Sequence, residues 1–426
     1  RDRAEPLDVY LTVNDLWVAD SDKKTAPTNL TKDFPGSPSG RFSSGADEPP
    51  RWSPDGKWLW FVGAERSNLN IYRVASTGGG KVEAITRVEG EISRLSFDRA
   101  FRYVAFSWTD FANPADLFVS ETKPQTNGSF APRQITHARK LVKKYGLRMP
   151  ERLTWKSPDG TEVEGFLFLP RGTADGKPAP LMFDAHGGPA FRWGNAFSYR
   201  YMWHVFADHG IGSLIFNPRG STAYGEKFLR GNFMGFGQGD FQDLMAAVDL
   251  LIKRGVTAPD RIGMTGYSYG GFMTNMVVSH TERFKVAVSI AGGFNFASGM
   301  GQSNSILPRA YYQPMESEEN MRRMLEHSPV MRAMKVKTPT LILHGKADTA
   351  VHHMQAIEMF TSLQLAGCPS KLVLYPGEGH GINTPKHMRH YLETSVRWIQ
   401  QYLAGWEDAG GAKLEERKAE AKKAGK

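Results

Sequence analysis

TGYSYGGF, residues 265–272, sets one serine, Ser268, between two tyrosines and among three glycines. The segment follows an apolar stretch, 262–264, that we expect to be a strand, and it leads into a helix-like stretch, 272–279. In that context Gly266–Gly270 matches the pattern G-x-S-x-G, in which a strained strand-to-helix turn exposes the serine hydroxyl. A glycine-rich turn that merely contains a serine would explain the segment alone equally well, so the rest of the chain must decide.

Two downstream loops supply the acid and the base that a serine needs to become a nucleophile. Asp348 ends the sequence HGKAD, which follows a predicted strand at 340–343, and His380 lies in GEGHG, after a predicted strand at 371–375. Ligand sites in such sheets lie outside the carboxyl ends of the strands, so we expect all three side chains at one rim. His380 would take the proton of Ser268, and Asp348 would orient the imidazole.

Other ionisable residues near these loops have simpler explanations. His344, His352 and His353 lie close to Asp348, but their spacing fits no common zinc motif, and we predict no metal site. No cofactor is implied.

Three carboxylates are weaker candidates for the acid. Glu378 is too near His380 in the chain to be an independent orienting group. Asp240 and Asp243 begin a stretch with helical spacing, 240–253, and we interpret them as charges at a helix start.

An acyl-transfer site also needs hydrogen-bond donors for an oxyanion. The backbone N–H of Tyr269, the residue after the serine, is the first candidate. The second should come from the early loop HGGP, 186–189, where we predict the N–H of Gly188, with Gly187 next. A plain β-turn is the alternative for that loop.

The chain around this motif predicts an α/β fold. From about residue 149, apolar strand candidates alternate with helical stretches, which is typical of a mostly parallel, doubly wound sheet covered on both faces. The first third instead reads as short strands and turns, with three similar segments about 50 residues apart, the spacing of propeller blades. We therefore predict a partial β-propeller of about three blades at 1–148, an α/β-hydrolase domain at 149–405 and a charged, flexible tail at 406–426. An unrelated β-sandwich is the alternative for the first part.

Composition limits the function classes. The 426 residues carry a formal net charge of +9, but Lys and Arg are scattered and no basic helix or aromatic-basic strand motif appears, so we predict no nucleic-acid binding. No apolar run approaches the ~18 residues of a membrane span. The single cysteine, Cys368, excludes an internal disulfide framework. Because three blades would leave open sheet edges, we expect further blades before Arg1. A leader could then also precede Arg1, so the sequence does not decide between a cytoplasmic and an exported protein. It does not decide whether the chain forms a homo-oligomer either.

The ordered set of motifs resembles the prolyl oligopeptidase family of serine peptidases, most closely its acylaminoacyl-peptidase and dipeptidyl-peptidase-like branch. The resemblance is close over about 151–403 and loose over the repeats. It implies a propeller joined to an α/β-hydrolase domain, short peptide substrates, and a triad of Ser268, Asp348 and His380. The motifs that carry it are HGGP (186–189), NPRGS (217–221), GYSYGG (266–271), HGKAD (344–348) with Val351, and GEGHG (377–381).

Some positions depart from the family's pattern. Several members place a tyrosine hydroxyl on the loop where this chain has HGG, 186–188, and some carry an arginine two residues after the aspartate, where this chain has Ala350. The paired glutamates with which dipeptidyl peptidases hold a free amino terminus have no convincing match in the sequence. The resemblance therefore leaves the choice between dipeptidyl, acylaminoacyl and endopeptidase action open.

The sequence thus predicts a serine peptidase that acts through an acyl-enzyme. An esterase or lipase with the same triad is the main alternative, and a non-catalytic binding protein on the same fold is a second. Apolar residues after the strand that follows the elbow are candidates for a substrate pocket, with core packing as the other explanation: Phe294, Phe296, Tyr311, Tyr312 and, after the acid, Val351.

Overall fold

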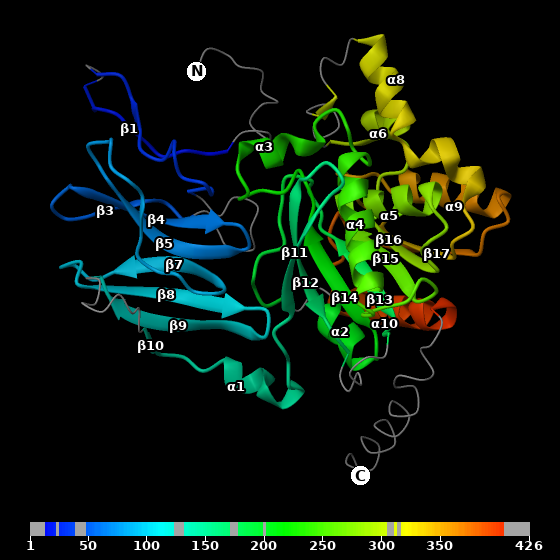
Figure 1. Cartoon of the computed structure of the whole chain (residues 1–426), viewed down its shortest axis with the longest axis horizontal. Helices are drawn as coiled ribbons and strands as arrows, with labels where there is room; N and C mark the ends of the chain where they lie inside the picture. The colour runs from blue at the N-terminus through cyan, green and yellow to red at the C-terminus, as the bar shows by residue number, and fades with distance from the viewer. Residues whose placement is uncertain are drawn as a thin grey trace.

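The structure is a computed structural model that describes residues 13–22, 25–38, 48–122, 132–170, 178–198, 202–304, 311–312 and 317–403. Two sheet systems lie side by side along the long axis of the molecule: a smaller antiparallel part built from the N-terminal strands and a larger α/β part (Figure 1). The predicted tail, 406–426, lies outside the described residues, and the predicted boundary at 148/149 stays a prediction.

The larger part is organised by an eight-stranded sheet in the order β11-β12-β14-β13-β15-β16-β17-β18. β12 pairs antiparallel with both β11 and β14, and every other neighbouring pair is parallel. The carboxyl ends of β13 and β15 to β18 therefore meet at one edge, which confirms the predicted α/β-hydrolase fold. The strands are β11 (Glu151–Lys156), β12 (Glu162–Phe168), β13 (Leu181–Ala185), β14 (Gly212–Asn217), β15 (Ile262–Tyr267), β16 (Val286–Ile290), β17 (Thr340–Gly345) and β18 (Ser370–Tyr375).

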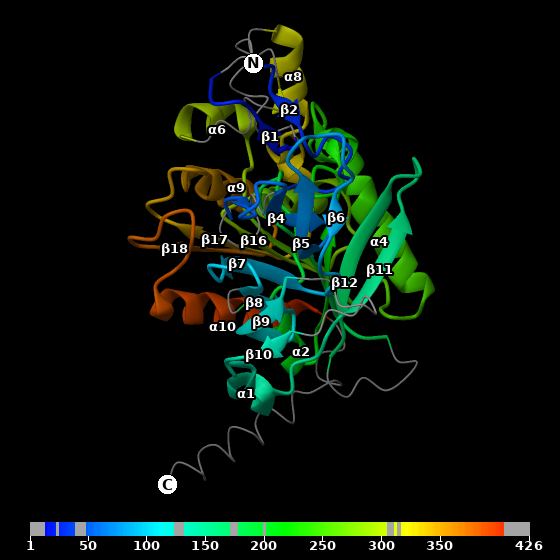
Figure 2. The ribbon, with the colours of Figure 1, turned by 90° about the vertical axis from the view of Figure 1, so that its left-hand side faces the viewer.

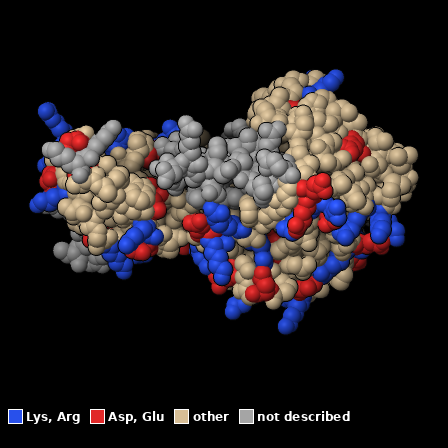
Figure 3. Space-filling view, turned by 90° about the horizontal axis from the view of Figure 1, so that it is seen from above, with Lys and Arg blue, Asp and Glu red and all other residues tan. Residues whose placement is uncertain are grey.

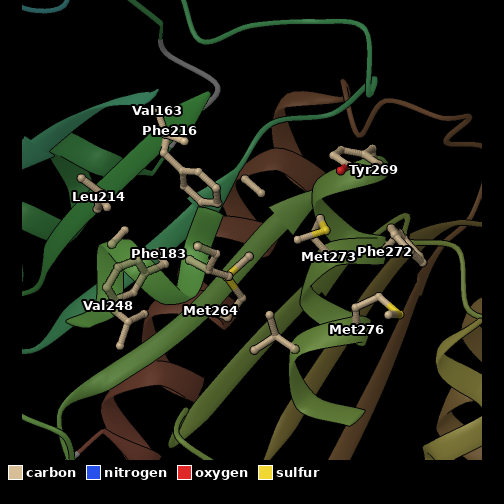
Figure 4. Close-up of a cluster of buried hydrophobic side chains, with 14 of the residues drawn as sticks. Val163, Phe183, Leu214, Phe216, Val248, Met264, Tyr269, Phe272, Met273 and Met276 are labelled. Carbon is tan, nitrogen blue, oxygen red and sulfur yellow. The ribbon is translucent and has the colours of Figure 1, made fainter. Parts of the chain in front are cut away.

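Helices cover both faces of this sheet, because its central strands are buried on both sides. α4 (Gly239–Lys253), α5 (Tyr269–His280) and α9 (Met354–Leu365) pack on one face, and α2 (Trp203–Asp208) and α10 (Pro385–Tyr402) pack on the other. Figure 4 shows how the α4 and α5 side is filled: Val248 and Met273 meet strand residues such as Met264. The start of α5, which carries the elbow, is thus anchored on the main core.

Short helices occupy the connections. The described ones are α1 (Arg139–Val142), η2 (Lys143–Tyr145), α3 (Glu226–Leu229), η3 (Arg230–Asn232), α6 (Phe296–Gln302), α8 (Glu318–Glu326) and η4 (Pro329–Lys335). Among the helices that the structure describes, none combines the length and the apolar character of a membrane-spanning helix.

Among its described residues, the N-terminal part has two four-stranded antiparallel units and a separate two-stranded sheet, a hairpin. The hairpin joins β1 to β2, one unit runs β3-β4-β5-β6, and the other runs β7-β8-β9-β10. The strands of the two units pair at Leu69 opposite Glu91, in parallel, and side chains of both units share one buried apolar cluster. Successive four-stranded units of this kind are consistent with a partial β-propeller. The strands are β1 (Trp17–Val18), β2 (Thr28–Asn29), β3 (Arg51–Trp52), β4 (Trp58–Glu65), β5 (Asn68–Ala75), β6 (Glu83–Ala84), β7 (Glu91–Phe97), β8 (Tyr103–Asp110), β9 (Asn113–Glu121) and β10 (Arg133–Gln134).

The three similar segments of the sequence share one side-chain arrangement, which explains why they repeat. In each, a threonine at the end of the segment donates its hydroxyl to an Asp or Asn about 16 to 20 residues earlier and accepts the N–H of the residue after that Asp or Asn. The sets are Thr31 with Asp15 and Leu16, Thr86 with Asn70 and Ile71, and Thr136 with Asp116 and Leu117. The repeat therefore encodes a hydrogen-bonded clasp that joins the last two strands of each four-stranded unit and the two strands of the hairpin.

Buried contacts join the two parts. Arg192, in the loop after β13, reaches across to Glu91 of β7 and donates to the backbone oxygen of Ser67. Phe111, at the β8–β9 turn, packs among aromatic residues of the larger part, including Phe166 and Trp203. Figure 2, seen from the side of the antiparallel strands, shows these strands in front of the larger part, with β11 and β12 visible beside them. On the surface drawn in Figure 3, Lys and Arg are interspersed with Asp and Glu over both parts.

Candidate active site

The predicted elbow is the tight turn between β15 and α5. Ser268 has φ 59° and ψ −114°, a left-handed backbone conformation that is strained for a residue with a side chain. Its neighbours must be glycine, because a Cβ on Gly266 would lie 2.4 Å from the Gly270 carbonyl carbon, and one on Gly270 would lie 1.9 Å from the Ala185 oxygen. The turn therefore holds Ser268 at the amino end of α5, above the strand ends.

The structure brings the three predicted residues together at that edge. Asp348 lies in the loop after β17 and His380 in the loop after β18, 32 residues apart in sequence. His380 Nδ1 is 2.7 Å from Asp348 Oδ2, and His380 Nε2 is 2.9 Å from Ser268 Oγ. With Nδ1–H donating to the carboxylate, Nε2 is free to accept the serine proton, which is the arrangement a triad requires.

Asp348 is held in its ionised form. Burial by itself raises the pKa of this carboxyl, but hydrogen bonds from His344, His380 and the Val351 N–H outweigh burial and hold the pKa well below its usual range. The Ala350 N–H also donates to Oδ1 at 2.9 Å. Asp348 is thus a fixed anion beside the imidazole, suited to stabilise an imidazolium.

Two side chains that the sequence did not single out for this purpose position the His380 loop. Tyr267, the residue before Ser268, donates its hydroxyl to the His380 carbonyl at 2.5 Å and accepts the Ile382 N–H at 3.2 Å. Glu378 is not an orienting acid for the imidazole: it accepts the N–H groups of Asn383 and Thr384. Hydrogen bonds of the Tyr267 and Glu378 side chains therefore hold the backbone of the His380 loop in place at His380 and on its carboxyl-terminal side.

The HGGP loop lies against the elbow, as predicted. A Cβ on Gly187 would lie 3.3 Å from Ser268 Cβ, and Gly188 has φ 126°, a conformation that favours glycine. Beneath the loop, His186 is fully buried, with Nδ1 2.6 Å from the Gly187 oxygen and Nε2 2.8 Å from Ser221 Oγ. Burial lowers the pKa of His186 to about 4, so this ring is neutral at pH 7. The assignment of the Tyr269, Gly188 and Gly187 N–H groups as oxyanion donors stays a prediction.

The structure places Asp240 at a helix start, as predicted, with Asp243 three residues further along the same helix. Both lie in the first turns of α4, but both side chains are completely buried. Asp240 accepts the hydroxyl of Tyr269, and Asp243 forms an ion pair with Arg219. Burial raises the pKa of Asp240 to about 6, and hydrogen bonds from Tyr269 and Gly237 oppose that shift. Helix periodicity placed these residues correctly in the chain but could not reveal what packs over them.

Two cavities flank Ser268 and share Gly188, Ser268 and His380 as lining residues. The first, which we call the aromatic cavity, has a volume of about 310 Å³ and lies on the Tyr269 side. The second, which we call the Asp184 cavity, has a volume of about 350 Å³ and lies on the side of the residues that follow His380. Both volumes are within the usual range for ligand pockets, ~300–1,000 Å³.

The structure divides the predicted pocket residues into two groups. Phe296 and Val351 line the aromatic cavity, together with Phe236 and Phe272. Phe294, Tyr311 and Tyr312 do not line it: each has at most 1% of its surface exposed, and each is part of a core cluster. Tyr311 packs on Phe236 with ring centroids 4.5 Å apart, so it supports the cavity wall from behind. The aromatic-rich sequence after the elbow does not by itself distinguish residues that line the cavity from residues that are buried behind its wall.

The histidines next to Asp348 have structural contacts. His344 Nε2 lies 2.8 Å from the Val351 oxygen and 3.2 Å from Asp348 Oδ2. The described residues hold no group of three or more His, Cys, Asp or Glu side chains arranged to bind a metal ion.

Comparison with known proteins places the chain in a family. The model of the prolyl oligopeptidase family matches residues 197–405, a range that includes all three of Ser268, Asp348 and His380. The chain belongs to the prolyl oligopeptidase family.

Relatives in this family extend the match to the N-terminal part. The chain is 30% identical over 370 residues to the uncharacterised peptidase YuxL of Bacillus subtilis, covering 85% of this chain and 54% of that protein. It is 25% identical over 359 residues to dipeptidyl-peptidase 5 of Porphyromonas gingivalis, covering 83% of this chain and 51% of that protein. The chain thus spans about half the length of the curated relatives it matches.

Solved structures share the fold over almost the whole chain. Pyrococcus horikoshii acylaminoacyl peptidase superposes with a TM-score of 0.75 at 23% identity, covering 92% of this chain and 59% of that chain. Porphyromonas gingivalis dipeptidyl peptidase 4 does so with a TM-score of 0.74 at 17% identity, covering 91% and 53%. These two similarities support the fold assignment.

Proposed function

We propose that this chain is the catalytic part of a serine peptidase that hydrolyses short peptides by acyl transfer. The observation that carries the proposal is the chain of contacts Asp348–His380–Ser268, with distances of 2.7 and 2.9 Å, at a strained elbow. Family membership supports peptide-bond hydrolysis, and relatives named dipeptidyl-peptidase 5 support peptides as the substrate class.

The proposed reaction has two halves. Ser268 Oγ attacks the scissile carbonyl carbon while its proton passes to His380 Nε2, and the negative charge of the resulting oxyanion is stabilised by the N–H groups of Tyr269 and Gly188. The C–N bond then breaks as Nε2 gives the proton to the leaving amine. In the second half, water attacks the acyl carbon and gives a proton to His380 Nε2. The bond between that carbon and Ser268 Oγ then breaks as Nε2 returns the proton to Oγ, which releases the acid and free Ser268.

The aromatic cavity is the place for the side chain of the acyl residue, P1. It is lined by Tyr269, whose N–H is the proposed oxyanion donor, and its walls are apolar side chains: Phe236, Phe272, Phe296 and Val351. Since an apolar pocket of this kind binds apolar groups by removing their surface from water, we expect large apolar P1 residues to be preferred over charged ones.

Covalent labelling with a fluorophosphonate probe tests the nucleophile. We expect the probe on Ser268, identified by mass spectrometry, and no labelling in Ser268→Ala. Ser362→Ala is the matched control, because Ser362 lies on α9 and donates only to the Glu358 backbone oxygen among described residues. Absence of labelling in a folded sample would reject the triad, and the binding-protein interpretation would lead.

A second measurement separates a peptidase from an esterase with the same triad. Peptide amides and the matching esters, each with Phe, Leu or Asp at P1, should be compared by kcat/KM. The peptidase proposal expects turnover of the Phe and Leu amides, lost in Ser268→Ala. Turnover of esters alone would favour the esterase.

A further inference from the structure

The Asp184 cavity is a second chamber at the active site, separate from the aromatic cavity. It lies on the face of the sheet that α2 and α10 cover, since Met202 lines it just before α2 and Met388 and Tyr391 line it from α10. Most of its lining is apolar, and Asp184 is the one carboxylate among its described lining residues. A buried carboxylate in an apolar chamber beside a reactive serine requires an explanation.

Asp184 has one oxygen without a partner. Its side chain is only 6% exposed, and Trp203 Nε1 donates to Oδ2 at 2.9 Å. No described residue donates to Oδ1, and no described Lys, Arg or His forms an ion pair with this carboxylate. Anchoring the Trp203 indole needs only an acceptor, which an asparagine would supply without a charge. The negative charge of Asp184 and its Oδ1 atom are therefore not needed to hold the Trp203 indole.

Burial raises the pKa of Asp184 to about 7, opposed by the hydrogen bond from Trp203. The carboxylate form is thus costly in this apolar chamber, and a cation placed beside Oδ1 would offset that cost.

The two cavities extend from Ser268 in different directions: Tyr269 lines only the aromatic cavity, and the residues after His380 line only the Asp184 cavity. After attack, the acyl carbon stays bonded to Ser268 with its oxyanion at the Tyr269 N–H, so the acyl part lies in the aromatic cavity, which Tyr269 lines. The leaving amine must face His380, which gives it a proton. The residues directly after His380, namely Gly381, Ile382 and Asn383, line the Asp184 cavity.

The depth of Asp184 suits a long side chain. Asp184 of β13 pairs in register with Thr265 of β15, three residues before Ser268. At ~3.3 Å per residue along a strand, the carboxylate lies on the order of 10 Å below the nucleophile. Lysine and arginine place their charge at the end of the longest flexible side chains, so they can reach this depth while their methylene stems contact the apolar walls.

We propose that the Asp184 cavity binds the P1′ residue of the substrate and that Asp184 selects a basic P1′ side chain, lysine or arginine. This proposal rests on the proposed peptidase function for the meaning of P1′, but the site itself can be tested by binding alone.

The test is calorimetric titration of Ser268→Ala protein at pH 8.5, where Asp184 is ionised, with two product-like dipeptide amides. Lys-Ala-amide carries the basic side chain, and norleucine-Ala-amide has the same four side-chain carbons without the terminal amine. We expect the lysine compound to bind about tenfold more tightly or better, the effect of one partly desolvated ion pair. Asp184→Asn should reduce this ratio to about one, while Asp249→Asn, which removes a carboxylate exposed on α4, should leave it unchanged.

A second variant keeps the proposal testable if Asp184→Asn does not fold. Met388→Lys places a tethered cation in the same chamber and should abolish the lysine preference. Equal affinity of the two amides, no measurable binding of either at millimolar concentration, or a ratio that survives both variants would overturn the proposal. Because no turnover is measured, failure of peptide hydrolysis by the wild-type chain would reject the peptidase proposal and leave the binding ratio interpretable.

Discussion

Arg192 Nη2 lies 2.8 Å from Glu91 Oε1, and both side chains are buried where the antiparallel strands meet the loop that carries Gly188. Arg192 also donates to the Ser67 backbone oxygen at 3.1 Å. The contact ties β7 and the turn between β4 and β5 to the loop proposed to hold the oxyanion. Stability of the active-site loop should therefore depend on the N-terminal strands.

Arg192→Met tests this dependence. The variant leaves the Glu91 carboxylate buried without the Arg192 guanidinium, so we expect the free energy of unfolding to fall by about 3–5 kcal/mol, measured by chemical denaturation. Arg66→Met is the matched control, because the Arg66–Glu162 pair joins the same two parts but is 40% and 49% exposed. It should cost at most ~1 kcal/mol. Equal costs for the two variants would contradict the special role of Arg192.

Gly270→Ala should disrupt the elbow although alanine is the better helix former by ~1 kcal/mol. The added Cβ would lie 1.9 Å from the Ala185 oxygen, so β13 or α5 must move. We expect a loss of about 1–3 kcal/mol or more in stability, together with loss of fluorophosphonate labelling. In Gly301→Ala, on α6, the Cβ meets nothing within 4 Å, and both properties should be retained. Normal labelling of Gly270→Ala would show that the elbow tolerates a side chain.

Tyr267→Phe should slow catalysis more than it destabilises the fold. The variant loses the hydroxyl that connects the elbow strand to the His380 carbonyl and the Ile382 N–H. We expect about tenfold slower labelling of Ser268, with a stability cost of ~1 kcal/mol for the lost hydrogen bonds. Tyr103→Phe, at the exposed first residue of β8, serves as the control. A labelling rate equal to wild type would mean that other contacts suffice to hold the loop.

Asp240 should make stability depend on pH. Its pKa is about 6 in the folded protein, against 3.8 for an ordinary aspartate. The folded state therefore binds this proton more tightly than the unfolded chain, so the free energy of unfolding falls as pH rises from about 4 to 6 and then levels off. Asp240→Asn, which still offers Tyr269 an acceptor, removes this contribution.

The measurement is the difference in unfolding free energy between variant and wild type across pH 4 to 8. We expect this difference to shift in favour of the variant by up to about 3 kcal/mol, since one pKa unit corresponds to ~1.4 kcal/mol. Asp249→Asn, at an exposed position of the same helix, should show no such shift. A pH-independent difference for Asp240→Asn would show that Asp240 does not titrate in this range.

Motifs within a single strand and its loop could be predicted because their signals are local. The elbow sequence around Ser268 and the loops of Asp348 and His380 each follow a strand pattern, and parallel strands end at a common edge. The clasp of Thr86 with Asn70 likewise recurs with its sequence repeat. Which aromatic side chains line the cavity and which are buried in the core was harder to predict. Phe294 and Phe296 are two residues apart with the same composition around them, yet only Phe296 reaches the cavity.

The sequence by itself determined the α/β-hydrolase class, the order of the motifs and the residues able to form a triad. The reason is that the glycines around the strained turn and the change from strand to helix periodicity both involve residues that are neighbours in the chain. Only the tertiary structure decided that Arg192 meets Glu91, that Asp240 holds Tyr269, and that Asp184 faces a chamber with one oxygen free. These relationships join segments that are distant in sequence or depend on which side chains exclude water. Tertiary packing decides these relationships, and no pattern within a short stretch of sequence encodes that packing.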